Sequence, residues 1–191
     1  MILPMFRRAP GDRNIHALYG MIVTQARAPV FYTGYGVPDT VEGRFELIVL
    51  HLVLLLNRLG REDRPAAGHR RGGGAAGKMV QRLFDVFCRD LDHNLREMGV
   101  GDLAVPRRMR RFGEAFYGRQ GAYCAALAAA NGQELEQALA RNIFGVAGVD
   151  ERVERLARYA RAVARQLDAD EEDAFATGKL VFPSPESFAH A

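Results

Sequence analysis

The chain has 191 residues, 48% of them hydrophobic and 26% charged, with a formal net charge of +3 at pH 7 and a pI near 9.1. This balance predicts one folded domain and excludes a mainly disordered or collagen-like chain. A surplus of three positive charges does not indicate DNA binding unless basic residues gather on one face, so we expect no DNA partner. Cys88 and Cys124 lie outside any CxxC motif or metal-ligand spacing, which argues for a reducing compartment and against a disulfide scaffold.

The amino terminus and the most apolar stretch argue against export and against membrane insertion. Residues 1–10 contain no apolar run long enough for a secretory signal, so we expect the mature protein to begin at Met1. The apolar stretch Leu47–Leu56 is ten residues long. A membrane-spanning helix needs about 20 residues. We therefore predict a soluble protein with this stretch in a core helix.

Helical periodicity dominates the first third of the chain. The apolar spacing of Ile15–Val23 predicts a first helix that Pro29 ends, and residues 28–38, rich in aromatics and turn formers, are expected to form an ordered loop. The sequence Asp39-Thr40-Val41-Glu42 has the spacing of a capping box. It predicts the start of a central helix, apolar nearly all round, that runs to about Leu59.

The same periodicity returns after an interruption. Residues 60–77 contain six glycines and no apolar period, which predicts a flexible, cationic loop. A third helix over residues 80–98 is expected to end at Gly99 in a left-handed C-cap, and Pro106 suits the first turn of a fourth helix. Two further helices are predicted over residues 133–144 and 150–167.

These elements predict an all-α fold: one compact helical domain of about six to eight helices with an extended C-terminal tail. We divide the chain into an N-terminal extension (residues 1–12), the helical domain (13–183, with the loop 60–77 inside it) and a C-terminal tail (184–191). Residues 178–183 are expected to lie as an extended segment on the body.

Signatures of common enzymes and metal sites are absent: the sequence has no GxSxG, GxxxxGK[ST] or HExxH. We therefore predict no catalytic residue, no metal and no cofactor. His51 lies among leucines and is interpreted as a core histidine, with haem binding by His51 or Cys88 as the alternative. An enzyme would require a pocket that gathers Asp92, His93 and Asp102.

The segment 90–103 is dense in charge and contains a tight glycine turn. Asp92 and Arg96 are four residues apart and can form an ion pair on one helix face, while Asp102 can cap the next helix. We interpret Asp92, Arg96 and Asp102 as a structural polar corner. The alternative is a metal site of Asp90, Asp92 and Asp102, which lacks the spacing of a calcium loop.

A dense group of arginines follows this corner. Five arginines stand against the single Glu114 between Ala104 and Arg119, and four of them fall within five positions. This density predicts a cationic docking patch for an acidic protein surface, ribosomal RNA or anionic lipid, and composition leaves the three open. The arginines are Arg107, Arg108, Arg110, Arg111 and Arg119.

Three stretches carry a resemblance to a known family: Val37-Pro38-Asp39-Thr40, Leu95-Arg96-Glu97-Met98-Gly99-Val100-Gly101-Asp102 and Phe116-Tyr117-Gly118-Arg119. Over roughly residues 15–182 the chain resembles the ubiquinol-cytochrome c chaperone family, which includes the mitochondrial cytochrome b assembly factors and their alphaproteobacterial relatives.

The resemblance implies a helical, non-enzymatic chaperone that binds newly made cytochrome b and promotes assembly of the cytochrome bc1 complex. The chain fits a bacterial member, which implies a cytoplasmic location with peripheral contact at the inner membrane. It also implies a ribosome as a second partner. The rival function is a ribosome- or RNA-associated basic helical protein without a cytochrome client, and an enzyme ranks third.

On the chaperone interpretation, a groove of exposed aromatic residues shields apolar segments of the client, and the arginines supply polar docking. The alternative is that these aromatics close the core. The candidate aromatic residues are Phe31, Tyr32, Tyr35 and Tyr117.

Overall fold

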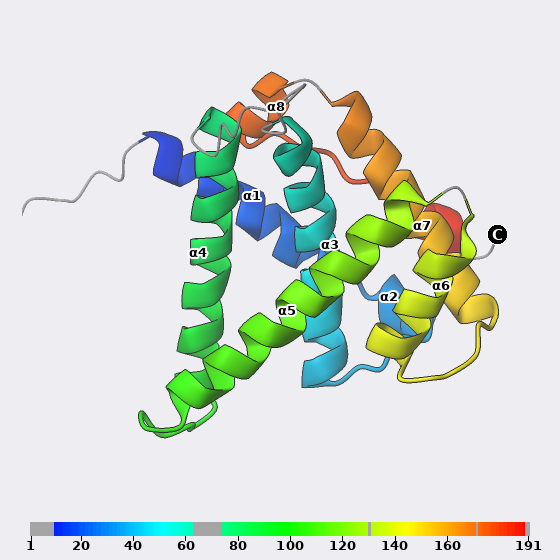
Figure 1. The fold of residues 1–191 in the computed structure, drawn as a ribbon, viewed down its shortest axis with the longest axis horizontal. Helices are drawn as coiled ribbons and strands as arrows, with labels where there is room; N and C mark the ends of the chain where they lie inside the picture. Colours follow the sequence, from blue (N-terminus) through cyan, green and yellow to red (C-terminus); the bar gives the residue numbers. More distant parts are fainter. Residues whose placement is uncertain (1–9, 63–73, 130, 171, 190–191) are drawn as a thin grey trace, which may run out of the picture.

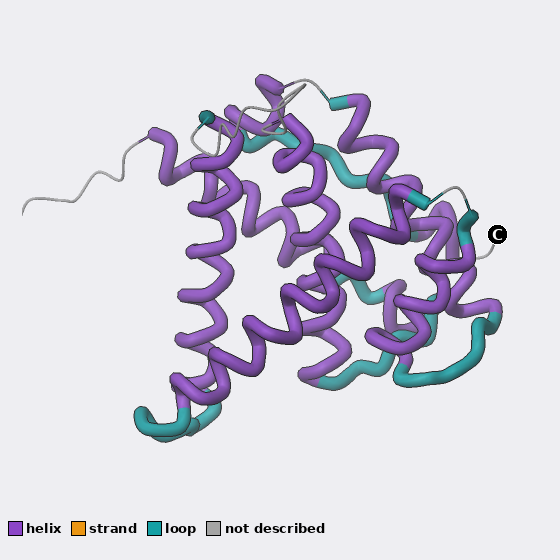
Figure 2. The backbone as a smooth tube through the Cα atoms, viewed as in Figure 1, coloured by secondary structure: helices purple, strands orange, loops and turns teal. Residues whose placement is uncertain are grey.

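The computed structural model describes residues 10–62, 74–129, 131–170 and 172–189. Within these ranges every regular element is a helix and none is a strand (Figures 1 and 2), which confirms the predicted all-α fold. No helix in the same ranges combines the length and apolarity needed to cross a bilayer. The elements are α1 (Pro10–Ala26), α2 (Val30–Thr33), α3 (Val41–Glu62), α4 (Ala75–Glu97), α5 (Val105–Ala128), α6 (Gln133–Leu139), the π-helix η1 (Ala140–Phe144), α7 (Glu151–Ala169), α8 (Glu172–Thr177) and α9 (Glu186–Ala189).

Helix α3 is the central element. The side chains of Leu47–Leu56 are at most 9% exposed, so every face of this stretch is covered. The covering elements are α1, α4, α5, α7 and η1. A helix that is apolar all round is stable in water only when other elements cover all of its faces. The apolar stretch therefore determines where its neighbours must pack.

The start of α3 differs from the prediction by one residue. The capping acceptor is Thr40, whose Oγ1 accepts the Gly43 amide at 3.1 Å, whereas Asp39 accepts a hydrogen bond from Arg44 at 2.7 Å. Gly43 lies so close to the preceding loop that a Cβ atom there would be 2.0 Å from the carbonyl oxygen of Pro38. The entry into α3 therefore depends on glycine at this position.

The end of α4 matches the prediction. Gly99 has a φ of 78°, its amide donates to the Arg96 carbonyl at 3.0 Å, and the Val100 amide donates to the Leu95 carbonyl at 3.0 Å. These two bonds form a Schellman motif, which ends the helix at a defined place. Pro106 lies in the first turn of α5, as expected. Residues 98–104, the α4–α5 turn, thus connect two long helices through a fixed backbone conformation.

Two predicted loops contain more helix than expected. The segment 28–38 includes α2, and the glycine-rich loop is shorter than 60–77 because α3 continues to Glu62 and α4 begins at Ala75. Arg61 lies in the last turn of α3 and donates a hydrogen bond to Asp168 of α7 at 3.0 Å. The rest of the predicted loop, residues 63–73, lies outside the described residues.

The C-terminal segment lies on the body as predicted. Gln25 donates to the Pro183 carbonyl at 3.1 Å and the Tyr35 hydroxyl donates to the Pro185 carbonyl at 2.6 Å. The predicted tail at 184–191 also contains α9, which packs against α2 and α7. The Phe182 ring lies 5.7 Å from the His51 ring and the Phe188 ring 6.0 Å from the Tyr159 ring, measured between centroids, so this segment packs against the aromatic core.

His51 is a core histidine, as predicted. Its Nδ1 lies 2.7 Å from the Leu47 carbonyl oxygen, and its Nε2 lies 2.8 Å from the Tyr159 hydroxyl. A carbonyl can only accept, so Nδ1 carries the proton and Nε2 accepts from Tyr159, whose oxygen in turn accepts from Gln25 at 2.9 Å. Both ring nitrogens are engaged, which contradicts the haem-ligand alternative for His51. Burial lowers the pKa of His51 to about 4.

This burial predicts an acid-sensitive fold. The pKa of His51 is about 4 in the folded chain and 6.5 in the unfolded chain. Between these two pH values His51 is therefore protonated mainly in the unfolded state. The free energy of unfolding should fall by about 2 kcal/mol between pH 6.5 and pH 5. Urea unfolding at several pH values measures this loss. His51→Gln should remove most of the slope in this window, and an unchanged slope would contradict the assignment.

A pair of glycine substitutions tests the packing at the start of α3. Gly43→Ala should lower the free energy of unfolding by about 3 kcal/mol, because the new methyl group meets the Pro38 carbonyl. Gly20 lies in α1, and a methyl group added there would have no neighbouring atom within 4 Å. Gly20→Ala should therefore raise the free energy of unfolding by about 1 kcal/mol. Chemical denaturation compares the two variants, and equal effects would contradict the close approach.

Candidate functional site

A cleft of about 450 Å³ is bounded by α3, α4 and α5, with α1 at one end. Val41 and Met98 line it and are nevertheless 62% and 54% exposed. Concave, mainly apolar sites with exposed apolar side chains are typical of binding surfaces. The apolar lining consists of Val41, Phe45, Ile48, Phe87, Leu91, Leu95, Met98, Phe112 and Ala115.

Charged and polar groups of both signs complete the lining. Several already have partners: Arg44 binds Asp39, and Asp90 accepts the Tyr19 hydroxyl at 2.8 Å. These contacts give Arg44 and Asp90 hydrogen-bond partners within the protein. The apolar side chains of the lining remain available to bind apolar groups of a partner. The charged and amide residues of the lining are Arg27, Glu42, Arg44, Glu46, Asp90, Asn94, Glu97 and Arg119.

Glu46 and Arg119 form a mostly buried ion pair that connects α3 to α5. The Arg119 side chain donates Nε and Nη2 to the two Glu46 carboxylate oxygens, and Nη1 donates to the Ala115 carbonyl at 3.1 Å. The side chains are only 10% and 20% exposed. Burial raises the pKa of the Glu46 carboxyl, while the Arg119 guanidinium acts in the opposite direction. Arg119 therefore differs from the other arginines of the predicted docking set: its charge is already bound by Glu46.

The predicted aromatic groove is wrong for two of its four members. Phe31 and Tyr35 are fully buried. The Phe31 ring lies edge-on to Tyr159 with 5.1 Å between centroids, so these residues close the core. Tyr32 is half-buried and donates to the Ala26 carbonyl at 3.0 Å, whereas Tyr117 is 61% exposed. None of the four lines the cleft.

The aromatic residues of the cleft are a different set. Phe45 and Phe112 contact each other with ring centroids 4.9 Å apart, and Phe87 lies 6.1 Å from Phe45. Helical spacing places Phe87 and Phe112 on the inward faces of their helices, but it carries no sign that these faces leave a cleft between them. Only the mutual arrangement of α3, α4 and α5 creates it.

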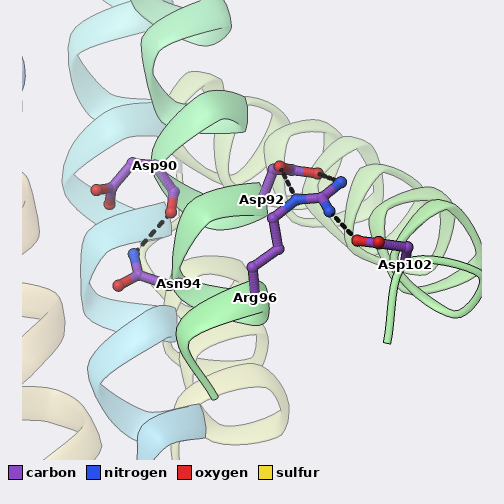
Figure 3. Close-up of polar contacts among 5 residues, drawn as sticks. All are labelled: Asp90, Asp92, Asn94, Arg96 and Asp102. Carbon is purple, nitrogen blue, oxygen red and sulfur yellow. Dashed lines mark hydrogen bonds and ion pairs between the residues drawn. The ribbon is translucent and has the colours of Figure 1, made fainter. Parts of the chain in front are cut away.

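The predicted polar corner is present (Figure 3). Arg96 donates through Nε to Asp92 at 2.7 Å and through Nη1 to Asp102, so one guanidinium joins α4 to the α4–α5 turn. The predicted capping role of Asp102 is wrong: the N-cap residue of α5 is Ala104, and no side chain caps this helix. Asp102 lies two residues before the N-cap position, and its carboxylate binds Arg96 instead.

The residues named for the alternative metal site and for the alternative catalytic pocket are not brought together. Asp90 faces away from Asp92 in Figure 3 and accepts from Tyr19 of α1, so the three carboxylates do not converge. His93 pairs with Glu97 at 3.0 Å. None of Asp92, His93 and Asp102 lines the cleft. Among the described residues no three His, Cys, Asp or Glu side chains are placed to hold a metal ion.

The four remaining arginines lie in the first two turns of α5 and all are exposed. We call Arg107, Arg108, Arg110 and Arg111 the cationic patch. The α4–α5 turn beside them projects from the body at the lower left of Figure 2. Leu103 belongs to this turn and is 99% exposed.

Together these features define a helical protein built around a central apolar helix, with a cleft lined by apolar and charged residues and, beside it, a projecting turn followed by the cationic patch at the start of α5. Over residues 33–182 the sequence matches the family described as ubiquinol-cytochrome C chaperone. The chain belongs to this family, whose members are assembly chaperones of ubiquinol-cytochrome c reductase, and the resemblance noted in the sequence is thereby confirmed.

Two relatives agree with this assignment. The chain is 27% identical over 168 residues to ubiquinol-cytochrome-c reductase complex assembly factor 1 of Xenopus laevis, which covers 86% of this chain and 78% of that protein. The crystal structure of the Cbp3 homolog from Brucella abortus is 35% identical and superposes with a TM-score of 0.78, covering 97% of this chain and 98% of that one. The fold is thus shared over nearly all of the chain in that crystal structure.

The Glu46–Arg119 pair yields a stability prediction. Arg119→Leu leaves the Glu46 carboxylate buried without a partner and should lower the free energy of unfolding by about 3 kcal/mol at pH 7. The double variant Glu46→Leu with Arg119→Leu should recover most of this loss, because it removes both charges. Denaturant unfolding of the three proteins measures the coupling. A double variant no more stable than Arg119→Leu would contradict a buried charge as the cause.

Proposed function

We propose that this protein is a non-enzymatic chaperone that binds newly made cytochrome b in the cleft and promotes its assembly into the cytochrome bc1 complex. The observation that carries the proposal is the apolar cleft with Val41 and Met98 exposed at its surface. Membership of the assembly-chaperone family supports the choice of client. The absence of a convergent carboxylate or histidine cluster in the described residues is compatible with a binding function.

The size of the cleft indicates how a client would be held. A volume of about 450 Å³ accommodates a few side chains rather than a complete helix. A membrane-protein client would therefore place one or two apolar side chains between Phe45, Phe112 and Met98, as an amphipathic helix does in a groove. Polar residues flanking that segment would meet the charged lining, in particular Arg27, Arg44 and Glu42.

The same dimensions suit transient binding. Complete burial of one Val or Met side chain contributes about 1.5–3 kcal/mol, so a contact of this size releases its client readily. An assembly factor must release the client when partner subunits arrive. Tyr32 and Tyr117, which lie outside the cleft, remain candidate contacts for a client that extends beyond it. We place the protein at the cytoplasmic face of the inner membrane, where such a client is inserted.

A capture experiment tests the proposal. Tagged protein purified from detergent-solubilised membranes of the native host should recover cytochrome b polypeptide. The variant Val41→Asp with Met98→Gln should reduce this recovery at least fivefold, because it makes the exposed part of the cleft polar. Aspartate in the first turn of α3 is favourable for the helix, so the variant should remain folded. Immunoblotting of cytochrome b in the eluate measures recovery.

The matched control is Val181→Asp with Val149→Gln. These residues are 71% and 39% exposed and do not line the cleft. Recovery should equal that of the unaltered protein. Loss of the gene should also reduce the b-type signal in dithionite-reduced membrane spectra while other cytochromes remain. Equal recovery with the cleft variant and its control would contradict the cleft as the client site, and a normal b-type signal without the gene would contradict the function.

A further inference from the structure

We propose that the α4–α5 turn and the cationic patch form a docking surface for an anionic lipid bilayer. The exposed Leu103 would enter the boundary between headgroups and acyl chains, and the four arginines would contact lipid phosphates. The inference concerns how the protein reaches a membrane and does not depend on which client the cleft holds.

The arginines of the patch are free to bind a partner. The buried side of α5 is formed by Val105, Met109 and Phe112 at helical spacing, so the positions between them point away from the body. All four arginines are exposed, and no described acidic side chain forms an ion pair with any of them. Residues 98–111 contain a single acidic residue, Asp102, and Arg96 already binds it. The patch therefore presents four positive charges that have no acidic partner among the described residues.

Leu103 is presented on a rigid support. The Schellman motif at Gly99 determines the backbone on one side of the turn, and the Arg96–Asp102 ion pair holds the residue that precedes Leu103. A leucine with 99% of its side chain exposed therefore projects from an ordered turn rather than a loose end. Met98 adds a second exposed apolar side chain to the same turn. An apolar tip flanked by arginines is the pattern of an interfacial membrane contact.

Lipid fits this surface better than RNA. Single-stranded RNA is recognised largely by stacking on aromatic side chains, and residues 98–111 contain no aromatic residue. A projecting leucine contributes nothing to phosphate binding in water, whereas a bilayer provides both the phosphates and an apolar layer. Arginine also forms paired hydrogen bonds with phosphate oxygens. Of the two, a lipid surface alone would use Leu103 and the four arginines together.

Docking through this turn has a consequence for the cleft. Met98 belongs both to the α4–α5 turn and to the cleft lining. In Figure 1 α3 begins on the same lower side of the molecule on which α4 ends. A bilayer contacted by Leu103 would therefore lie next to one end of the cleft. Docking through this surface would hold the cleft at the membrane boundary, where an apolar client segment leaves the bilayer.

Vesicle flotation tests the proposal with the purified protein. The probes are liposomes of phosphatidylcholine with 30% phosphatidylglycerol and liposomes of phosphatidylcholine alone. One basic residue near an anionic leaflet contributes about fivefold to partitioning. Replacing the four arginines by serine should lower partitioning onto anionic liposomes by about 600-fold, and Leu103→Ser by about tenfold. Neutral liposomes should bind the unaltered protein only weakly.

The control replaces four exposed arginines elsewhere, Arg13, Arg89, Arg141 and Arg165, by serine, which changes the net charge equally. This variant should lose less than about threefold if the patch acts locally. Equal losses in both quadruple variants would overturn the proposal, as would the absence of binding to anionic liposomes. Unchanged binding of Leu103→Ser would contradict insertion. Binding of a single-stranded RNA oligonucleotide that needs the patch, without liposome binding, would assign the patch to nucleic acid instead.

Discussion

Burial of α3 on every face constrains the helices that surround it. Because the stretch Leu47–Leu56 has no polar face, α1, α4, α5 and α7 must each cover part of it. Helices α4 and α5 meet at the projecting turn and diverge from it: α4 runs beside α3, whereas α5 crosses α3 (Figure 1). The cleft lies along the first half of α3, between the end of α4 and α5. It is thus a consequence of how two covering helices share one central helix.

Two buried polar groups give this apolar arrangement its specificity. His51 connects α3 to α7 through Tyr159, and Gln25 extends the network to α1 and the C-terminal segment. Glu46 connects α3 to α5 through Arg119. Buried polar groups lose free energy unless their partners are present, so alternative packings of the same apolar faces would leave these groups unsatisfied. Both His51 and Glu46 belong to α3, so the polar groups that favour this packing lie on the central helix.

The sequence predicts what depends on neighbours in the chain and fails where distant segments meet. Helix periodicity, the Gly99 cap and the Asp92–Arg96 pair are local, and each is present as expected. Phe31 and Tyr35 look exposed because turn formers surround them, but α7 and the C-terminal segment, more than a hundred residues away, cover them. Arg119 looks like part of a basic run, yet its partner lies 73 positions earlier.

The small net charge conceals a local concentration of positive charge. Asp168 in the last turn of α7 binds Arg61 at the C-terminal end of α3, about 30 Å along that helix from its start beside the cleft. Among the described residues no acidic side chain forms an ion pair with the four arginines of the cationic patch, and all four are exposed. A surplus of three charges spread evenly would attract no particular surface. Concentrated beside one projecting leucine, it gives the molecule an orientation toward an anionic surface.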